Sequence, residues 1–497
     1  MTKILSFIIL LTSLTFGQSD LLLLFADAAD SVDSPTSILA VGNVAKITLS
    51  WTNAATYDSV KIYRGTSTDP TTLVYTLAGG TTSKVDSALT EETIYYYRVK
   101  GKIGGSLSSY SSNASDTVLA IMYAVDLDGS TEYMSKTTPV NLDLNGAGRI
   151  TDTKNRDMNG AVDYATNGNH SVTDSVTADK HAGTYSMTIT SSAAGDATTN
   201  YVSLASSKFT TLVSGEKYTL EAWMRATNAS AVCTLAIGNQ TKVSGTLSTV
   251  AGTFTKVVWN FQATANEVNQ PIKIFYNQAD VVYVDDVSLA QKYDIMISLW
   301  AKMSRDGGND NMISNNPTNA TYGYLLKKTT ANKLSFTLGD GTTTTNNSPT
   351  TTYTTQTTFR HIVITTNIDS TRLYVDGIWK LSADASIIGV SPISVMFALG
   401  RLSYVDLQYF SGQIGETQIT RFTDIATSNY TPLQIYNRSK AKFHFPNAYT
   451  GGTIVGHWKF SGATDGVMLQ DYSASGNNLV GSGVTQAGDQ VILIGGY

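Results

Sequence analysis

One stretch of alternating sequence decides the fold, Leu373-Tyr374-Val375-Asp376-Gly377-Ile378-Trp379-Lys380. Apolar and polar residues alternate on both sides of an Asp-Gly pair, which supplies the positive φ angles of a tight hairpin turn. Alternation of period two is typical of strands that bury one face. The stretch therefore predicts an antiparallel β-hairpin, and we interpret its residues as structural, without a role in a binding site.

The composition extends this interpretation to the whole chain of 497 residues. Charged residues make up only 15%, apolar residues reach 42%, and the chain has 27 Tyr but only nine Pro. Thr, Ser, Asn and Gly are abundant, as in proteins built from many short strands joined by polar turns. At about 150 residues per domain, the length suggests about three domains. We predict an all-β protein.

Charge and cysteine content restrict the possible partners. The net charge is −5 and the pI about 5.6, and no cluster of Lys and Arg interleaved with aromatic residues is present to meet a phosphate backbone. Nucleic acid is therefore not expected as a partner. The single cysteine, Cys233, cannot form an internal disulfide, and its place in an apolar strand predicts a small core residue.

Residues 1–20 are predicted to be a signal peptide. Lys3 gives a basic start, residues 4–16 are apolar, and Thr15-Phe16-Gly17 forms a small-residue cleavage site before Gln18. The alternative is an apolar N-terminal tail that packs in an assembly, which the second apolar run at residues 21–26 also suits. No later segment approaches the roughly 20 apolar residues of a spanning helix. We therefore expect no membrane span and a secreted or cell-surface protein.

Residues 34–119 alternate in period two and resemble a fibronectin type III domain. The resemblance rests on Leu49-Ser50-Trp51, on Val60-Lys61-Ile62-Tyr63-Arg64, and on Leu89 six residues before Tyr95. It implies a seven-stranded β-sandwich in which Trp51 is the core tryptophan and Tyr95 ties its hydroxyl back to nearby backbone. Both roles are structural, and the segment has no Arg-Gly-Asp. We predict a spacer.

Residues 121–145 and 293–497 together resemble a laminin-G-like, concanavalin-A-type jelly roll. The opening strand is Tyr123-Ala124-Val125-Asp126-Leu127-Asp128-Gly129. The next landmark, Ile295-Met296-Ile297-Ser298-Leu299-Trp300, arrives about 150 residues later than the family pattern places it. The remaining landmarks follow in order: Phe359-Arg360-His361-Ile362-Val363, then Thr371-Arg372-Leu373-Tyr374-Val375-Asp376-Gly377, Leu399-Gly400-Arg401 and Phe410-Ser411-Gly412-Gln413-Ile414-Gly415-Glu416. The domain is therefore predicted to be discontinuous.

The end of the chain leaves two possibilities open. Gly456-His457-Trp458-Lys459-Phe460 and Asp471-Tyr472-Ser473-Ala474-Ser475-Gly476 resemble a strand and a loop that many members of the laminin-G-like family carry at the start of the domain. Residues 456–497 either complete the same sheets or begin a truncated second copy.

Residues 146–292 are too long for a structureless loop inside a compact domain, so we expect an inserted module. Their landmarks are His181-Ala182-Gly183-Thr184-Tyr185, Tyr218-Thr219-Leu220-Glu221-Ala222-Trp223 and Val282-Tyr283-Val284-Asp285-Asp286. They resemble family 4 and 9 type carbohydrate-binding modules, which are β-jelly rolls whose two ends meet, a geometry that suits insertion. The opening Asn-Gly-x-Phe-Glu motif of that family is degraded here.

Candidate sugar-binding residues follow from the chemistry of carbohydrates. Flat aromatic faces stack against apolar CH patches, and planar polar groups bind hydroxyls. Trp223 and Arg225 share one strand face in the predicted module, and Tyr201 and Tyr276 are candidates to join them. The alternative for each aromatic residue is a place in the core.

Calcium is the one cofactor that the sequence suggests, as a structural ion. The resemblance to carbohydrate-binding modules implies that Asp285 and Asp286 help to hold calcium beside the His-Ala-Gly turn. Since neighbouring strand residues point to opposite faces, we expect only one to face the site and favour Asp286. Asp126 and Asp128 share a strand face and are a second candidate pair. The alternatives are a solvated acidic turn and simple polar alternation.

Catalysis is not predicted. Glycosidases need two carboxylates flanking the scissile bond, whereas the chain has only seven Glu and no Glu-x-Asp-x-Glu. The five histidines show no zinc-ligand spacing, and no Gly-x-Ser-x-Gly motif is present.

The sequence as a whole predicts a non-catalytic, exported or surface binding or adhesion protein that recognises polysaccharide or surface glycan. The first alternative is a structural component of a phage virion appendage, whose partners would be other virion proteins. A third possibility is an accessory region of an enzyme on another chain.

Overall fold

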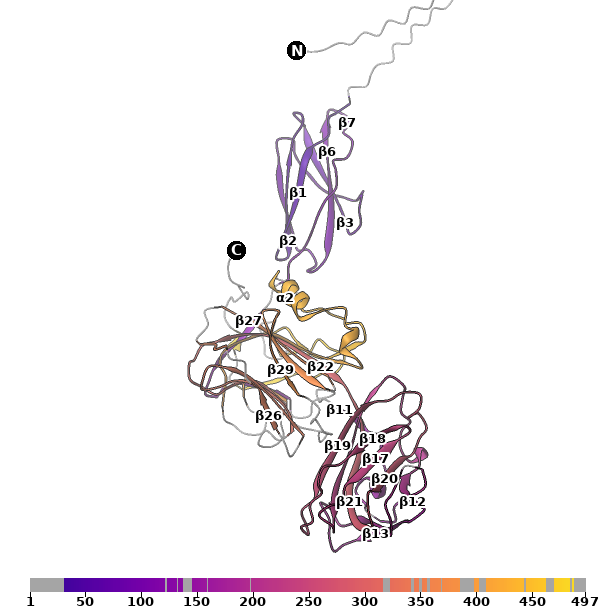
Figure 1. Cartoon of the computed structure of the whole chain (residues 1–497). Helices are drawn as coiled ribbons and strands as arrows, with labels where there is room; N and C mark the ends of the chain where they lie inside the picture. Colours follow the sequence, from indigo (N-terminus) through magenta and orange to yellow (C-terminus); the bar gives the residue numbers. More distant parts are fainter. Residues whose placement is uncertain are drawn as a thin grey trace, which may run out of the picture. The chain divides into compact units, whose positions relative to one another are not determined.

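A computed structural model describes the chain in two compact units, Met1–Val118 and Leu119–Tyr497, built almost entirely of strands (Figure 1). The described residues are 31–120, 123–131, 133–136, 145–158, 160–196, 198–315, 322–340, 344–347, 351–354, 358–367, 369–384, 397–401, 408–441, 444–461, 469–482 and 485–486. The predicted signal peptide, residues 1–20, lies outside them. The prediction of an all-β fold is confirmed.

The first unit is a sandwich of two antiparallel sheets. One sheet has the order β1-β2-β5 and the other β4-β3-β6-β7, with β8 also on β6. Trp51 lies in the core between them, and the hydroxyl of Tyr95 accepts a hydrogen bond from the N–H of Thr90 at 3.4 Å. The strands are β1 (Thr36–Asn43), β2 (Lys46–Thr52), β3 (Ser59–Gly65), β4 (Leu73–Ala78), β5 (Ser83–Ser87), β6 (Ile94–Ile103), β7 (Ser106–Leu107) and β8 (Ala114–Thr117).

In the second unit, two large sheets enclose one core. The orders are β29-β28-β27-β22-β31-β9-β34, with β32 also on β31, and β26-β25-β24-β23-β30-β10-β33. The strands are β9 (Ala124–Asp128), β10 (Tyr133–Lys136), β22 (Asp294–Met303), β23 (Asp310–Asn315), β24 (Tyr322–Lys328), β25 (Leu334–Asp340), β26 (Thr344–Asn347), β27 (Arg360–Thr366), β28 (Ser370–Val375), β29 (Ile378–Asp384), β30 (Phe397–Leu399), β31 (Ser411–Phe422), β32 (Gly452–Trp458), β33 (Val480–Ser482) and β34 (Thr485–Gln486).

The C-terminal strands complete these two sheets. β32 pairs with β31, β33 with β10, and β34 with β9. Trp458 at the end of β32 is fully buried in the shared core. This pairing decides between the two possibilities that the sequence left open, because strands of a separate second copy would pair with one another.

Between β10 and β22 the chain forms two further sheets with a core of their own. The orders are β13-β14-β21-β16-β19, with β11 also on β21, and β12-β15-β20-β17-β18. The elements are β11 (Asn145–Gly148), α1 (Thr153–Arg156), β12 (Tyr164–Asn167), β13 (His170–Val176), β14 (Ser186–Ser191), β15 (Tyr201–Leu204), η1 (Ser206–Lys208), β16 (Lys217–Ala226), β17 (Cys233–Ile237), β18 (Gln240–Val243), β19 (Thr255–Gln262), β20 (Ile272–Tyr276) and β21 (Asp280–Lys292).

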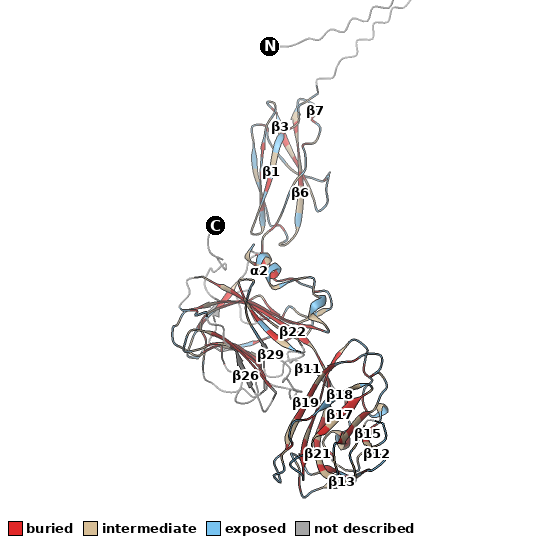
Figure 2. Ribbon diagram, viewed as in Figure 1, coloured by how far each residue is buried: buried red, intermediate tan, exposed pale blue. Residues whose placement is uncertain are grey.

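The long helix α2 (Pro432–Lys440) follows the short turn η2 (Ile425–Thr427) and packs on the sheet that contains β22 and β31. Its buried residue Ile435 joins Trp300 and Phe445 in a second apolar cluster, on the side of this sheet opposite the main core. The solvent side of α2 is exposed (Figure 2). No helix in the described ranges has the length and apolar character needed to cross a membrane.

Candidate functional site

The sheet that contains β16 has one face in the core and one face outside it, which we call the outer face. Leu220, Ala222 and Met224 of β16 belong to the core. Successive strand side chains point to opposite sides, so Trp223 and Arg225 lie together on the outer face. The sequence predicted that the two share one strand face.

Trp223 forms a stacked pair with His181 on the outer face. The two ring centroids are 3.7 Å apart and the rings are inclined by 11°. Nδ1 of His181 lies 2.6 Å from Oδ2 of Asp286, and these two side chains keep 29% and 28% of their surface exposed. Trp223 is half-buried. An indole, an imidazole and a carboxylate therefore meet at the solvent boundary.

A β-bulge brings both acidic residues of β21 to the His181 turn. Asp286 has φ 45°, and the register between β16 and β21 shifts between Glu221 and Trp223. Asp285 accepts hydrogen bonds from the N–H groups of His181 at 2.9 Å and Ala182 at 3.2 Å. The expectation that only one of the two carboxylates faces this turn was wrong, because a bulge interrupts strict alternation.

Asp285 is a fully buried carboxylate. Burial, together with the negative charge of Asp286, raises its pKa to about 6, against the lowering effect of three backbone hydrogen bonds. Those bonds engage both oxygens of Asp285, and Oδ2 of Asp286 lies 2.6 Å from Nδ1 of His181. In the part of the chain that the structure describes, no three His, Cys, Asp or Glu side chains converge as metal ligands. Calcium binding by Asp285 and Asp286 stays a prediction.

The second candidate pair, Asp126 and Asp128, lies exposed on one face of β9. Asp128 accepts hydrogen bonds from the N–H groups of Ser130 at 2.7 Å and Thr131 at 3.0 Å. Its carboxylate therefore stabilises the turn that follows the strand, and calcium binding by this pair also stays a prediction.

Arg225 is not available to a ligand. It is 6% exposed, forms a buried ion pair with Asp179, and donates a hydrogen bond to the carbonyl oxygen of Thr249 at 3.2 Å. Its guanidinium also lies 4.3 Å from the ring centre of Tyr283. The expectation that Arg225 binds sugar hydroxyls beside Trp223 is corrected, because loops between strands cover this end of β16.

The two candidate tyrosines lie away from Trp223, on the other sheet of this core. Tyr276 is fully buried, and its hydroxyl donates to the carbonyl oxygen of Ile189 at 2.9 Å, so no ring face is open to a sugar. Tyr201 is half-buried, with Nζ of Lys273 4.3 Å from its ring centre. The predicted grouping of Trp223 with Tyr201 and Tyr276 is not met, because β15 and β20 do not belong to the sheet of β16.

Lys256 and Glu221 form an ion pair beside Trp223. Nζ of Lys256 lies 3.0 Å from Oε2 of Glu221 and 5.7 Å from the ring centre of Trp223. Ser288 donates to Glu221 at 3.2 Å. The cation nearest to the indole is therefore already neutralised by a carboxylate.

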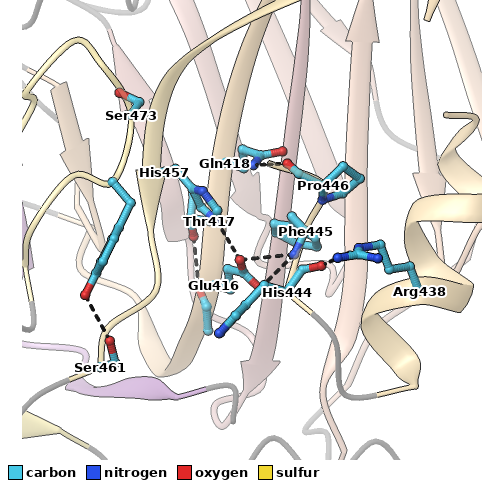
Figure 3. A network of polar contacts seen from close by, with 12 residues as sticks. Glu416, Thr417, Gln418, Arg438, His444, Phe445, Pro446, His457, Ser461 and Ser473 are labelled. Carbon is cyan, nitrogen blue, oxygen red and sulfur yellow. Dashed lines mark hydrogen bonds and ion pairs between the residues drawn. The ribbon is translucent and has the colours of Figure 1, made fainter. Parts of the chain in front are cut away.

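A buried polar network in the second unit was missed at the sequence level (Figure 3). Oε1 of Glu416 on β31 lies 2.6 Å from Nε2 of His457, and Oε2 lies 3.3 Å from Nδ1 of His444. Oε1 also accepts a hydrogen bond from the N–H of Phe445 at 3.1 Å. Burial alone would raise the pKa of Glu416, but the two histidines lower it to about 2. No sequence signal links these residues, since they are 28 and 41 positions apart.

Comparison with known proteins supports the concanavalin A-like interpretation. Residues 275–423 match the Concanavalin A-like lectin/glucanases superfamily. A search of curated proteins finds no significant match. The matched segment begins within β20 and ends just after β31, so it covers the central strands of the large sandwich.

Solved structures are similar to parts of the chain. An Fn3-like protein from Clostridium thermocellum is 24% identical over 17% of this chain and 91% of its own, with a TM-score of 0.16. The Ruminococcus gnavus IT-sialidase CBM40 bound to alpha2,3 sialyllactose is 12% identical, over 27% of this chain and 76% of its own, with a TM-score of 0.23. The receptor binding domain of botulinum neurotoxin D is 17% identical, over 30% of this chain and 38% of its own, also with a TM-score of 0.23.

Proposed function

We propose that this protein is a non-catalytic, exported or surface protein that binds polysaccharide or surface glycan. The match of residues 275–423 to a superfamily of lectins and glucanases supports carbohydrate as the ligand class. The likeness of residues 146–292 to family 4 and 9 carbohydrate-binding modules belongs to the same proposal and indicates where the first site lies.

The observation that carries the proposal is the half-exposed pair of Trp223 and His181 on the outer face. An aromatic ring at the solvent boundary offers a flat surface for the CH face of a pyranose. The carboxylate of Asp286, 2.6 Å from His181, is placed to accept hydrogen bonds from hydroxyl groups. Together they provide the mixture of one apolar face and few polar groups that small-ligand sites use.

The carboxylates favour binding over hydrolysis. A glycosidase needs an acid and a second carboxylate about 5 to 9.5 Å apart, facing the substrate. Glu416, which lies in the lectin and glucanase match, is fully buried and engaged by His444, His457 and the backbone. Glu221 is paired with Lys256. Neither side chain is free to act as the acid or nucleophile of a glucanase.

Glycan-array binding with the mature protein tests the proposal. We expect Trp223→Ala to weaken binding to the best glycan at least tenfold, because the stacking surface is removed. Val243→Ala, an exposed position on β18, is the matched control and should bind like the parent. Silence across a broad array would contradict the function, and unchanged binding by Trp223→Ala would contradict the site.

The predicted calcium sites are tested in the same preparation. If the ion binds at Asp285 and Asp286, adding calcium after chelator treatment should raise the melting temperature, more at pH 7.5 than at pH 5, since the pKa of Asp285 is about 6. Asp286→Asn should abolish the rise and Asp126→Asn should leave it unchanged. The opposite pattern would assign the ion to β9, and no rise in any variant would remove calcium from the proposal.

A further inference from the structure

Trp379 departs from the other tryptophans of the chain. Trp51, Trp259, Trp300 and Trp458 are buried in the cores, whereas Trp379 on β29 is 61% exposed. An exposed indole offers a flat apolar face on which a ligand can stack. The hairpin of residues 373–380, which the sequence predicts to be structural, thus also carries an exposed aromatic side chain.

The register of the hairpin gathers polar groups around this indole. Trp379 pairs with Tyr374 on β28, and Ser382 pairs with Arg372. Directly paired residues lie on the same side of an antiparallel sheet, and the intervening Leu373 belongs to the main core. The four residues therefore share the opposite side, where they line a depression of about 360 Å³.

Arg372 gives this depression its charge. It is exposed, and none of the residues that the structure describes provides it with a hydrogen bond or an ion pair. Near Trp223, by contrast, the cations are neutralised: Arg225 by Asp179 and Lys256 by Glu221. The planar guanidinium presents two parallel N–H groups that match a carboxylate.

We propose that Trp379, Tyr374, Arg372 and Ser382 form a second carbohydrate site, which takes a pyranoside that carries a carboxylate. The indole stacks on the CH face of the ring, Arg372 binds the carboxylate, and the hydroxyl of Ser382 bonds to a ring substituent. The depression has the volume range of small-ligand pockets. This site rests on the proposed function of carbohydrate binding but does not depend on the site at Trp223.

The exposed apolar residues of the hairpin do not form one continuous patch. Ile378, which is 59% exposed, lines a separate depression with Tyr353, Val375 and Lys380. The depression beside Trp379 thus combines one large aromatic residue with polar neighbours. This favours a ligand of sugar size over the docking of another protein.

The test uses the full mature chain and matched pairs of ligands. The probes are trigalacturonate, triglucuronate and sialyllactose, each compared with its methyl ester, which keeps the ring but removes the charge. Binding is followed by titration calorimetry and by the protection of tryptophan fluorescence from iodide quenching. We expect at least one acid to bind tenfold or more tightly than its ester, and to protect Trp379.

The variants separate the contributions. Trp379→Ala should reduce binding of the acid at least tenfold, and Arg372→Ala should reduce it to the level of the ester. Lys380→Ala, whose side chain lines the other depression, and Trp223→Ala should leave this binding unchanged. Melting temperatures equal to that of the parent protein show that each variant is folded. We expect this because the substituted side chains lie at the surface.

Five results would overturn the proposal. The first three are no binding of any acid, equal binding of acid and ester, and unchanged binding by Trp379→Ala. The fourth is a shift from dimer to monomer in Trp379→Ala, which would make the surface a self-association site, and the fifth is tighter binding of a single-stranded oligonucleotide than of any acid. Loss of binding in Trp223→Ala alone concerns the first site only, whereas silence toward every glycan contradicts the proposed function, so the two failures are distinguishable.

Discussion

His361 is a histidine without a polar partner. It is fully buried, neither ring nitrogen has a hydrogen bond among the described residues, and its ring centre lies 5.0 Å from that of Trp300 and 5.5 Å from that of Phe445. Burial lowers its pKa to about 3, although the negative charge of Glu416 opposes this. The imidazole is therefore neutral in the folded protein through most of the acidic range.

This burial makes stability depend on pH. In the unfolded chain the imidazole binds a proton below about pH 6.5, whereas the folded chain does not until about pH 3. The free energy of unfolding therefore falls as the pH drops through this window, by about 2 kcal/mol at pH 5. We expect His361→Phe to make the decline shallower by that amount.

Urea unfolding of the second unit at pH 7.5, 6, 5 and 4.5 measures this effect. The quantity compared is the slope of stability against pH, so that any change in packing that is the same at every pH cancels. Equal slopes for the parent and His361→Phe would contradict the prediction.

At the scale of elements, the segment that follows α2 is attached to β31 by polar bonds. Glu416 accepts a hydrogen bond from the N–H of Phe445. The amide of Gln418 donates to the carbonyl oxygen of Pro446 at 2.9 Å and accepts a hydrogen bond from the hydroxyl of Tyr449 at 2.6 Å. The helix itself begins with a capping box between Thr431 and Gln434. A nine-residue helix is marginal alone, so its stability depends on this attachment and on the apolar cluster beneath it.

Replacing the central carboxylate should loosen that attachment. We expect Glu416→Gln to lower the free energy of unfolding by about 2 kcal/mol, because hydrogen bonds to a charged group are lost in a buried site. Hydrogen exchange should increase first in α2 and at residues 444–449. Asp126→Asn, an exposed carboxylate on β9 of the same sheet, is the control. Uniform exchange changes, or none, would contradict a local role for Glu416.

At the scale of the molecule, residues 145–292 leave and re-enter the large sandwich at adjacent points. Asn145 and Lys292 are register partners in the pairing of β11 with β21. Nζ of Lys217, in the same segment, lies 2.6 Å from Oδ2 of Asp294, and both side chains are nearly fully buried. Burial raises the pKa of Asp294 even though Lys217 and the backbone oppose it. The same Nζ lies 3.4 Å from Oδ1 of Asp424, so Lys217 links the two sets of sheets through two carboxylates.

Removal of residues 146–291 should show that the stability of the large sandwich depends on the ion pair between Lys217 and Asp294. When residues 146–291 are replaced by a short glycine-serine linker, Asp294 becomes a buried charge without its cation, which typically costs about 3 to 5 kcal/mol. We expect Asp294→Asn to stabilise the shortened chain but to destabilise the full chain. Urea unfolding of the four proteins measures this reversal, and an effect of the same sign in both backgrounds would contradict it.

Much of the architecture was predictable because its causes are local. Alternation of period two indicates strands wherever one face is buried, and the Asp376-Gly377 turn specifies a hairpin. Gly377 has φ +75°, and a Cβ there would lie 2.8 Å from Leu433 of α2. The all-β class and the shared strand face of Trp223 and Arg225 followed from such patterns, and the core role of Trp51 followed from the resemblance to fibronectin type III domains.

The candidate site was less predictable because its properties depend on residues far apart in the chain. The sequence by itself determined the strands, the turns and the alternation that puts Trp223 on one side of β16. Only the tertiary structure decided that Tyr276 is buried, that Asp179 neutralises Arg225, that a bulge turns Asp285 and Asp286 to one loop, and that Trp379 is exposed. Burial and charge pairing arise from which strands share a sheet and which loops cover it, and local alternation does not encode either choice.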